Sequence, residues 1–116
     1  MSQIQIAEKW FGAFNQQKIE DLLSLYDDNA EHFSPRLLKN YPDTKGLIKG
    51  KAAMRNWWQS AFDKMPSLRY HPIYIREEKD KIHLEYLRTV DNESDVMVKE
   101  YLQIANGKIV FSKVVG

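Results

Sequence analysis

Pro66 divides this sequence into two parts of different character, and this division restricts the fold more than any other feature. The stretch before Pro66 has apolar residues at spacings of three and four, which is typical of an amphipathic helix that the proline ends. These residues are Met54, Trp57, Trp58, Ala61, Phe62 and Met65. The chain after Pro66 consists of strand-like segments and short turns. Helices followed by consecutive strands predict an α+β fold.

Four strands are expected in the second part of the chain, each joined to the next by a short polar turn. They are Leu68 to Glu77, Lys81 to Val90, Asp95 to Ala105 and Lys108 to Val115. Asn106-Gly107 is the strongest turn signal, because both residues tolerate the positive φ that a tight hairpin requires. The four strands are therefore predicted to form an antiparallel meander.

Two further helices are expected at the start of the chain. Ser2 and Gln5 have the spacing of a capping box. An apolar face follows, made by Ala7, Trp10, Phe11 and Phe14, and a second one is made by Ile19, Leu22, Leu23 and Tyr26. The short polar break between them predicts an antiparallel pair of helices.

The segment from Tyr26 to Pro35 connects these helices to the rest of the chain. An acidic turn is followed by an extended stretch, which Pro35 is expected to stop. His32 and Ser34 then lie on one face of a strand, because side chains alternate along it. The segment from Arg36 to Gly50, rich in proline and glycine, predicts an irregular loop with at most one helical turn.

The register of the meander assigns side chains to its two faces. Pairing Leu84 with Leu102 places Tyr86 opposite Glu100 and avoids a contact between like charges. The face toward the helices is then expected to carry His71, Ile73, Ile75, Tyr86, Arg88 and Glu100. The outer face is expected to carry Tyr70, Tyr74, His83, Leu87 and Tyr101. An outer face this aromatic predicts a covered surface and hence a homodimer.

Composition limits the class of protein. At 116 residues the chain is expected to form one domain, residues 1–116. A net charge of +1 argues against a nucleic-acid partner, and the lack of a long apolar run argues against a membrane span. There are no cysteines and no signal-peptide pattern, so we expect a cytoplasmic protein.

The order of these elements resembles the nuclear-transport-factor-2-like superfamily, which includes SnoaL-like polyketide cyclases and ketosteroid isomerase. The resemblance covers essentially the whole chain. It rests on the opening helix pair that leads into a strand and on the last turn, Asn106-Gly107-Lys108-Ile109. It implies a cone-shaped α+β barrel in which about three N-terminal helices pack on a curved antiparallel sheet and enclose a pocket for a small hydrophobic molecule.

The resemblance to ketosteroid isomerase carries over three positions. The isomerase's oxyanion-hole tyrosine falls on Trp10, its carboxylate base on Ser34 and its second acid on Glu100. A serine hydroxyl needs a partner to take its proton before it can act as a base. We therefore expect no steroid isomerase activity.

The catalytic candidates are His32, Glu100 and Arg88. A pocket histidine has a pKa near working pH and is predicted to be a general base, although a structural histidine is the alternative. Glu100 is predicted to be a general acid tuned by Arg88, with a structural ion pair as the alternative. The remaining pocket lining is expected to comprise Trp10, Phe14, Ser34, Trp57, Trp58, His71, Tyr86 and Ser112. The tryptophans suit the core better than a ligand platform, and at least one of them is expected to line the cavity.

No metal or cofactor is expected. His32, His71 and Glu100 match a set of two histidines and one carboxylate in residue type, but no local spacing supports a metal site. Two functions stay open. One is acid–base chemistry of the isomerase, cyclase or hydrolase type on a small organic molecule. The other is a non-catalytic module for small-molecule binding or dimerisation.

Overall fold

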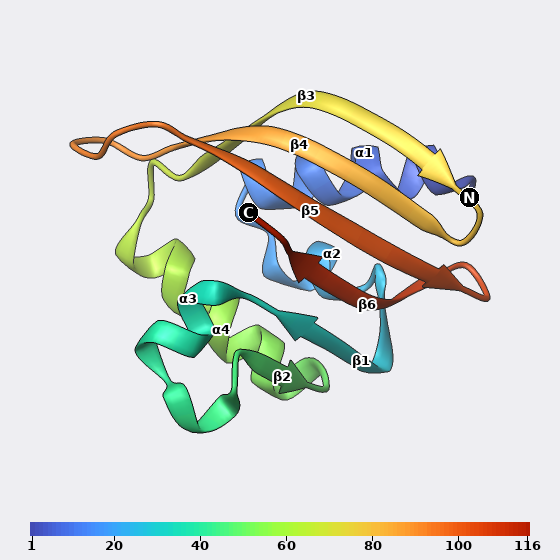
Figure 1. Ribbon diagram of the computed structural model, residues 1–116, viewed down its shortest axis with the longest axis horizontal. Helices are drawn as coiled ribbons and strands as arrows, with labels where there is room; N and C mark the ends of the chain where they lie inside the picture. Colours follow the sequence, from blue (N-terminus) through green and yellow to red (C-terminus); the bar gives the residue numbers. More distant parts are fainter.

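Helices cover one face of a curved, open six-stranded sheet in the computed structural model, which describes residues 1–116 (Figure 1). The expected α+β arrangement is confirmed. The helices are α1 (Gln3–Asn15), α2 (Ile19–Leu23), α3 (Pro35–Asn40) and α4 (Lys51–Lys64), with a short 3-10 turn, η1 (Pro42–Thr44). The strands are β1 (Tyr26–Phe33), β2 (Leu47–Lys49), β3 (Arg69–Glu78), β4 (Lys81–Thr89), β5 (Val96–Ala105) and β6 (Lys108–Val114).

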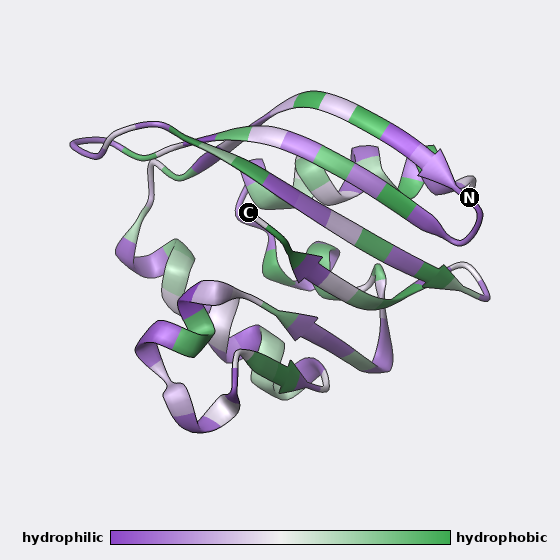
Figure 2. Cartoon of the chain, viewed as in Figure 1, coloured by the Kyte–Doolittle hydropathy of each residue, from purple (hydrophilic) through white to green (hydrophobic).

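The strand order is β2-β1-β6-β5-β4-β3, so the predicted meander forms one side of the sheet and β1 joins it through β6. The β1–β6 pair is parallel and every other pair is antiparallel. Asn106 and Gly107 both have positive φ, as the hairpin prediction requires. Hydrophobic and hydrophilic residues alternate along β4 and β5, which gives the sheet one buried face (Figure 2).

The first helix has the predicted capping box. The Ser2 hydroxyl accepts a hydrogen bond from the Gln5 backbone N–H at 3.1 Å, and the Gln5 side chain accepts one from Ser2 at 2.9 Å. The buried side of α1 carries Trp10, Phe11 and Phe14 and packs on β3 and β4. None of the helices combines the length and the apolar character that crossing a membrane requires.

The second helix is shorter than predicted. It ends at Leu23, and Tyr26 belongs to β1, opposite Ile109 of β6. Tyr26 is fully buried, and its hydroxyl bonds to Ser112. These contacts with β6, which helical spacing cannot reveal, override the local helical pattern.

The segment from Arg36 to Gly50 is more ordered than predicted. Pro35 does end the strand, but it also occupies the first position of α3, and the Ser34 hydroxyl caps that helix by accepting from the Arg36 N–H at 3.2 Å. Proline suits this position because the first turn of a helix leaves its N–H groups unpaired. The segment also supplies β2, which pairs with β1.

The predicted β4–β5 register is wrong by two residues. Leu84 lies opposite Glu100, and Tyr86 lies opposite Val98. The polar connection between the strands is longer than expected. Val90 has no partner in β5, and its backbone carbonyl accepts a hydrogen bond from the Glu93 backbone N–H within the turn. A shift of two residues preserves the faces of both strands, so Tyr86, Arg88 and Glu100 remain on the buried face as predicted.

The predicted facing of β3 is wrong in its first half. A bulge between Pro72 and Tyr74 shifts the register, so Tyr70 and Ile75 both face the helices. Proline lacks a backbone N–H and is tolerated where pairing is interrupted. As a result His71 is exposed beside Thr89, and Ile73 is also exposed.

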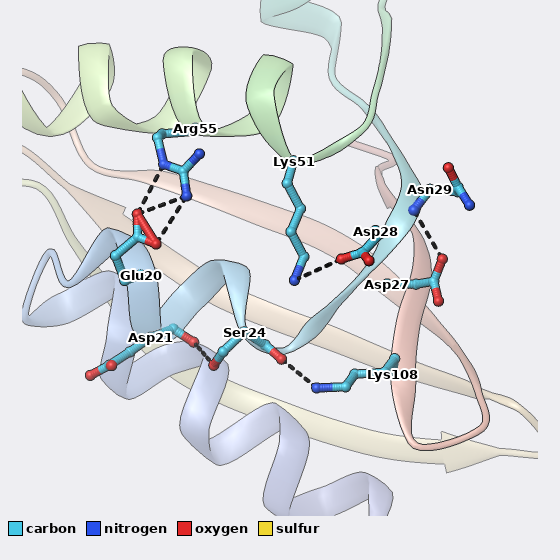
Figure 3. Close-up of polar contacts among 9 residues, drawn as sticks. All are labelled: Glu20, Asp21, Ser24, Asp27, Asp28, Asn29, Lys51, Arg55 and Lys108. Carbon is cyan, nitrogen blue, oxygen red and sulfur yellow. Dashed lines mark hydrogen bonds and ion pairs between the residues drawn. The ribbon is translucent and has the colours of Figure 1, made fainter.

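Ion pairs on the surface attach α4 to the first part of the chain (Figure 3). The Arg55 guanidinium donates to both carboxylate oxygens of Glu20 in α2 at 2.9 Å, and Lys51 lies 3.3 Å from Asp28 in β1. These pairs are exposed and contribute little to the free energy of folding. The buried residues Met54, Trp58 and Phe62 pack α4 onto the core, and its Trp58 side forms one wall of the cavity described below.

Candidate functional site

A cavity of about 350 Å³ opens between α3, α4 and the buried face of the sheet. This volume lies at the lower end of the usual range for small-molecule pockets. The buried part of its lining is Phe14, His32, Ser34, Trp58, Leu68, Tyr86, Arg88, Val98 and Glu100. Exposed lining residues mark the mouth: Pro35, Arg36, Asn40, Tyr41, Lys64, Val96 and Gly116. Polar groups therefore converge in a mainly apolar hollow.

A chain of buried hydrogen bonds runs from α1 to His32 through β1 and β6. The Trp10 Nε1–H lies 3.1 Å from the Tyr26 hydroxyl, which lies 3.1 Å from the Ser112 hydroxyl. The Ser112 Oγ lies 2.6 Å from His32 Nδ1. Ser112 and His32 are register partners in the parallel β1–β6 pair, which explains why residues so distant in sequence meet.

The chemistry of the donors gives this chain one direction. An indole N–H only donates, so the Tyr26 oxygen accepts from Trp10 and the Tyr26 proton goes to Ser112. The Ser112 proton is then left for His32 Nδ1, the one other group bonded to that hydroxyl. We infer from this direction that His32 is the neutral tautomer with its proton on Nε2, a nitrogen that has no hydrogen-bond partner in the protein.

Burial lowers the pKa of His32 to about 3. A charged imidazole would lose its hydration in this apolar site, and no carboxylate compensates for that loss. His32 also packs against the Trp58 ring, with the centroids 5.1 Å apart. These surroundings favour a neutral hydrogen-bond donor and do not suit the general base that the sequence predicted.

Glu100 is the buried carboxyl group of the cavity, and burial raises its pKa to about 7. The Tyr86 hydroxyl donates to Oε1 at 2.7 Å and acts in the opposite direction, since it stabilises the carboxylate. The second oxygen, Oε2, is buried and has no hydrogen-bond partner. A carboxyl group that changes charge near neutral pH and keeps one free oxygen can accept and return a proton.

Arg88 lies in the cavity but does not pair with Glu100 as predicted. The two-residue shift of β5 places Val96 opposite Arg88, and the guanidinium instead contacts Glu93 at 3.3 Å and the Met65 sulfur at 3.2 Å. The raised pKa of Glu100 is consistent with this arrangement, because a neighbouring cation would lower it.

Most of the remaining predicted pocket residues line the cavity: Phe14, Ser34, Trp57, Trp58 and Tyr86. Trp10 and Ser112 lie behind that surface and act on it through the hydrogen-bond chain to His32. His71 lies outside the cavity because of the β3 bulge. The three residues considered for a metal site consequently do not form a cluster.

Three residues of the site were not singled out from the sequence. Helical spacing predicts Tyr26 to be part of a helix, and exposed Asp28 interrupts the alternation that would otherwise link Tyr26 to His32 in a strand. Tyr70 was assigned to the outer face, and Pro72 was the available sign of a bulge. Arg36 was placed in a loop, whereas the Ser-Pro pair before it is a helix-start signal.

Comparison with known proteins agrees with this fold. The family model of the SnoaL-like domain matches residues 7–112. Among solved structures, a SnoaL-like protein of unknown function from Burkholderia thailandensis is 21% identical, with a TM-score of 0.86 over 99% of this chain and 98% of that one. No curated protein sequence matches.

Two further solved structures have names that refer to an activity. A candidate polyketide cyclase from Sinorhizobium meliloti is 17% identical, with a TM-score of 0.81 over 96% of this chain and 94% of that one. A candidate ketosteroid isomerase from Kribbella flavida is 15% identical, with a TM-score of 0.75 over 95% of this chain and 73% of that one. Identities this low show a shared fold alone. Any activity of this chain has to be inferred from the residues of its cavity.

The raised pKa of Glu100 predicts a pH-dependent effect of Glu100→Gln on stability. In the unfolded chain the carboxyl group ionises near its ordinary pKa of 4.5, whereas the folded protein holds the proton up to about 7. The stabilisation from the protonated form is therefore complete below pH 4.5 and is lost as the pH rises toward 7. As the pH is raised between these limits, the free energy of unfolding of Glu100→Gln, measured with urea, should increase by about 1–3 kcal/mol relative to that of the native protein.

The same substitution at exposed Glu77 is the matched control, because that side chain has no recorded ion pair or hydrogen bond. The interpretation of Glu100 as a buried, proton-holding group is wrong if the two variants show the same pH dependence relative to the native protein.

Proposed function

Because the chain belongs to the SnoaL-like domain family, we propose that its cavity binds a small organic molecule and transfers a proton on it. Glu100 is the proton carrier, and His32 is the donor that stabilises the oxygen on which charge develops. The observation that carries this proposal is the free, buried Oε2 of Glu100, a group whose pKa is raised to about 7 in a mainly apolar cavity.

The two groups suit complementary roles on a carbonyl compound. Glu100 Oε2 removes a proton from the carbon next to the carbonyl, and the C–H electron pair forms the enolate. The carbonyl oxygen, now negatively charged, accepts from His32 Nε2–H. The low pKa of His32 does not prevent this role, because a neutral imidazole still carries one N–H group that can donate a hydrogen bond. Glu100 then returns the proton to another atom of the enolate.

Tyr86 and Ser112 have supporting roles. Tyr86 holds Oε1 of Glu100 and so directs Oε2 as the reacting oxygen. Ser112 keeps the proton of His32 on Nε2. Ser34, at the position of the isomerase's base, caps α3 and has no recorded partner to take its proton. This arrangement favours chemistry centred on Glu100 over the arrangement of ketosteroid isomerase.

Deuterium exchange next to the carbonyl of cyclic ketones and lactones tests this proposal. Glu100→Gln should lower the exchange rate by about 10²–10³-fold, since a general base is removed without a change of shape. The rate of the native protein should rise with pH through about 7, as the carboxyl group ionises. Arg55→Gln is the control, because Arg55 is not part of the cavity lining.

The exchange experiment distinguishes an enzyme from a non-catalytic binding protein. Exchange that survives Glu100→Gln would contradict the assignment of the proton carrier. Binding of these compounds with no exchange would support the alternative, a non-catalytic small-molecule-binding module. Neither binding nor exchange across the panel would contradict both.

We also propose a homodimer through the outer face of the sheet. This face carries the aromatic pair Tyr101 and Phe111, with ring centroids 5.9 Å apart, and the exposed side chains of Tyr74 and Met97. Burying such a surface is favourable. Sedimentation should show a dimer that Tyr101→Lys weakens, and a native protein that is monomeric at high concentration would contradict the proposal.

A further inference from the structure

Cationic side chains line the cavity, Arg36 and Lys64 at its mouth and Arg88 in its buried part. Arg36, Lys64 and Arg88 all contribute to the lining, on α3, α4 and β4. Arg36 and Lys64 form no ion pair. The one carboxylate side chain in the lining is Glu100, which lies in the buried part. The mouth therefore has an excess of positive charge over an apolar interior.

Arg88 differs from an ordinary surface arginine. Its side chain is only 6% exposed, and its one ion pair is a single 3.3 Å contact to Glu93, whose side chain is 49% exposed. Its other recorded contact is to the Met65 sulfur, a weak acceptor. A guanidinium has five N–H donors, so Arg88 keeps donors free in a partly dry site. Planar groups of this kind suit the two oxygens of a carboxylate.

The positive charge extends into the cavity. Tyr70, which lines the wall, has its pKa raised by burial and by Glu100, and both Arg88 and Arg36 act on that pKa in the opposite direction. Both guanidinium charges therefore act on a residue of the cavity wall.

The apolar part of the lining lies next to this charge. Trp57 and Trp58 of α4 line the cavity, and the Tyr41 ring stands edge-on to Trp57 with the centroids 6.2 Å apart. Aromatic walls of this kind suit a flat or cyclic apolar body. The lining thus combines cationic groups with an aromatic wall.

We propose that the molecule bound in this cavity is an amphiphilic organic carboxylate, with its acid group held by Arg88 together with Arg36 and Lys64. Its apolar body lies against Trp57 and Trp58, and its reactive carbon is directed toward Glu100. This inference rests on the proposed small-molecule function and specifies the chemical class of the ligand.

Matched pairs of probes test the inference: 2-naphthoic acid against 2-naphthamide, and a cyclic keto acid against its methyl ester. Calorimetry should show each acid binding about tenfold more tightly than its neutral partner, because charged hydrogen bonds are stronger than neutral ones. Added salt should reduce this preference. Arg88→Met, which replaces the aliphatic stem and removes the guanidinium, should remove the preference without preventing the neutral probe from binding.

A second variant keeps the inference testable if Arg88→Met fails to fold. Arg36→Ser combined with Lys64→Ser changes only exposed positions and should also reduce the preference for the acid. Arg55→Gln, an exposed cation outside the cavity, should leave it unchanged. Equal binding of acid and neutral partner, in the native protein and in the variants, would overturn the anion inference. The role of Glu100 would stay intact, because deuterium exchange tests it separately.

Discussion

The hydrogen bond between Tyr26 and Ser112 is the interaction on which the proposed site depends. It joins the first strand of the chain to the last, and it sets the direction of the chain of bonds that ends at His32. The parallel pairing of β1 with β6 makes this contact possible, since it places Ser112 directly beside His32. In this account, an interaction between distant strands favours one of the two neutral tautomers of a cavity histidine.

Burial then separates the roles of the two titratable groups. The same loss of hydration lowers the pKa of His32 and raises that of Glu100, because in each case the neutral form is favoured. At neutral pH the histidine is a fixed donor, while the carboxyl group stands near the midpoint of its titration. In water, the pKa values of a histidine and a glutamate lie close together. Here burial moves them apart, so His32 serves as the hydrogen-bond donor and Glu100 as the proton carrier.

The α+β class, the meander and the burial of His32, Arg88 and Glu100 could be predicted from the sequence, because strand alternation and helical spacing fix which face a residue occupies. Pro72 is a sign of the β3 bulge, but it does not say where the register shifts, and that shift exchanged the faces of Tyr70 and His71. The pairing of Arg88 depended on a register that a longer turn shifted by two residues. Periodicity determines a face, but partners across strands depend on turn length and bulges.

The protonation state of His32 tests this account most directly. Long-range ¹H–¹⁵N NMR on the native protein should show a neutral ring with its proton on Nε2, unchanged between about pH 5 and pH 8. Ser112→Ala, which removes the donor to Nδ1, should allow the other tautomer to appear. A His32 ring that titrates near its ordinary pKa, or that carries its proton on Nδ1 in the native protein, would contradict the account.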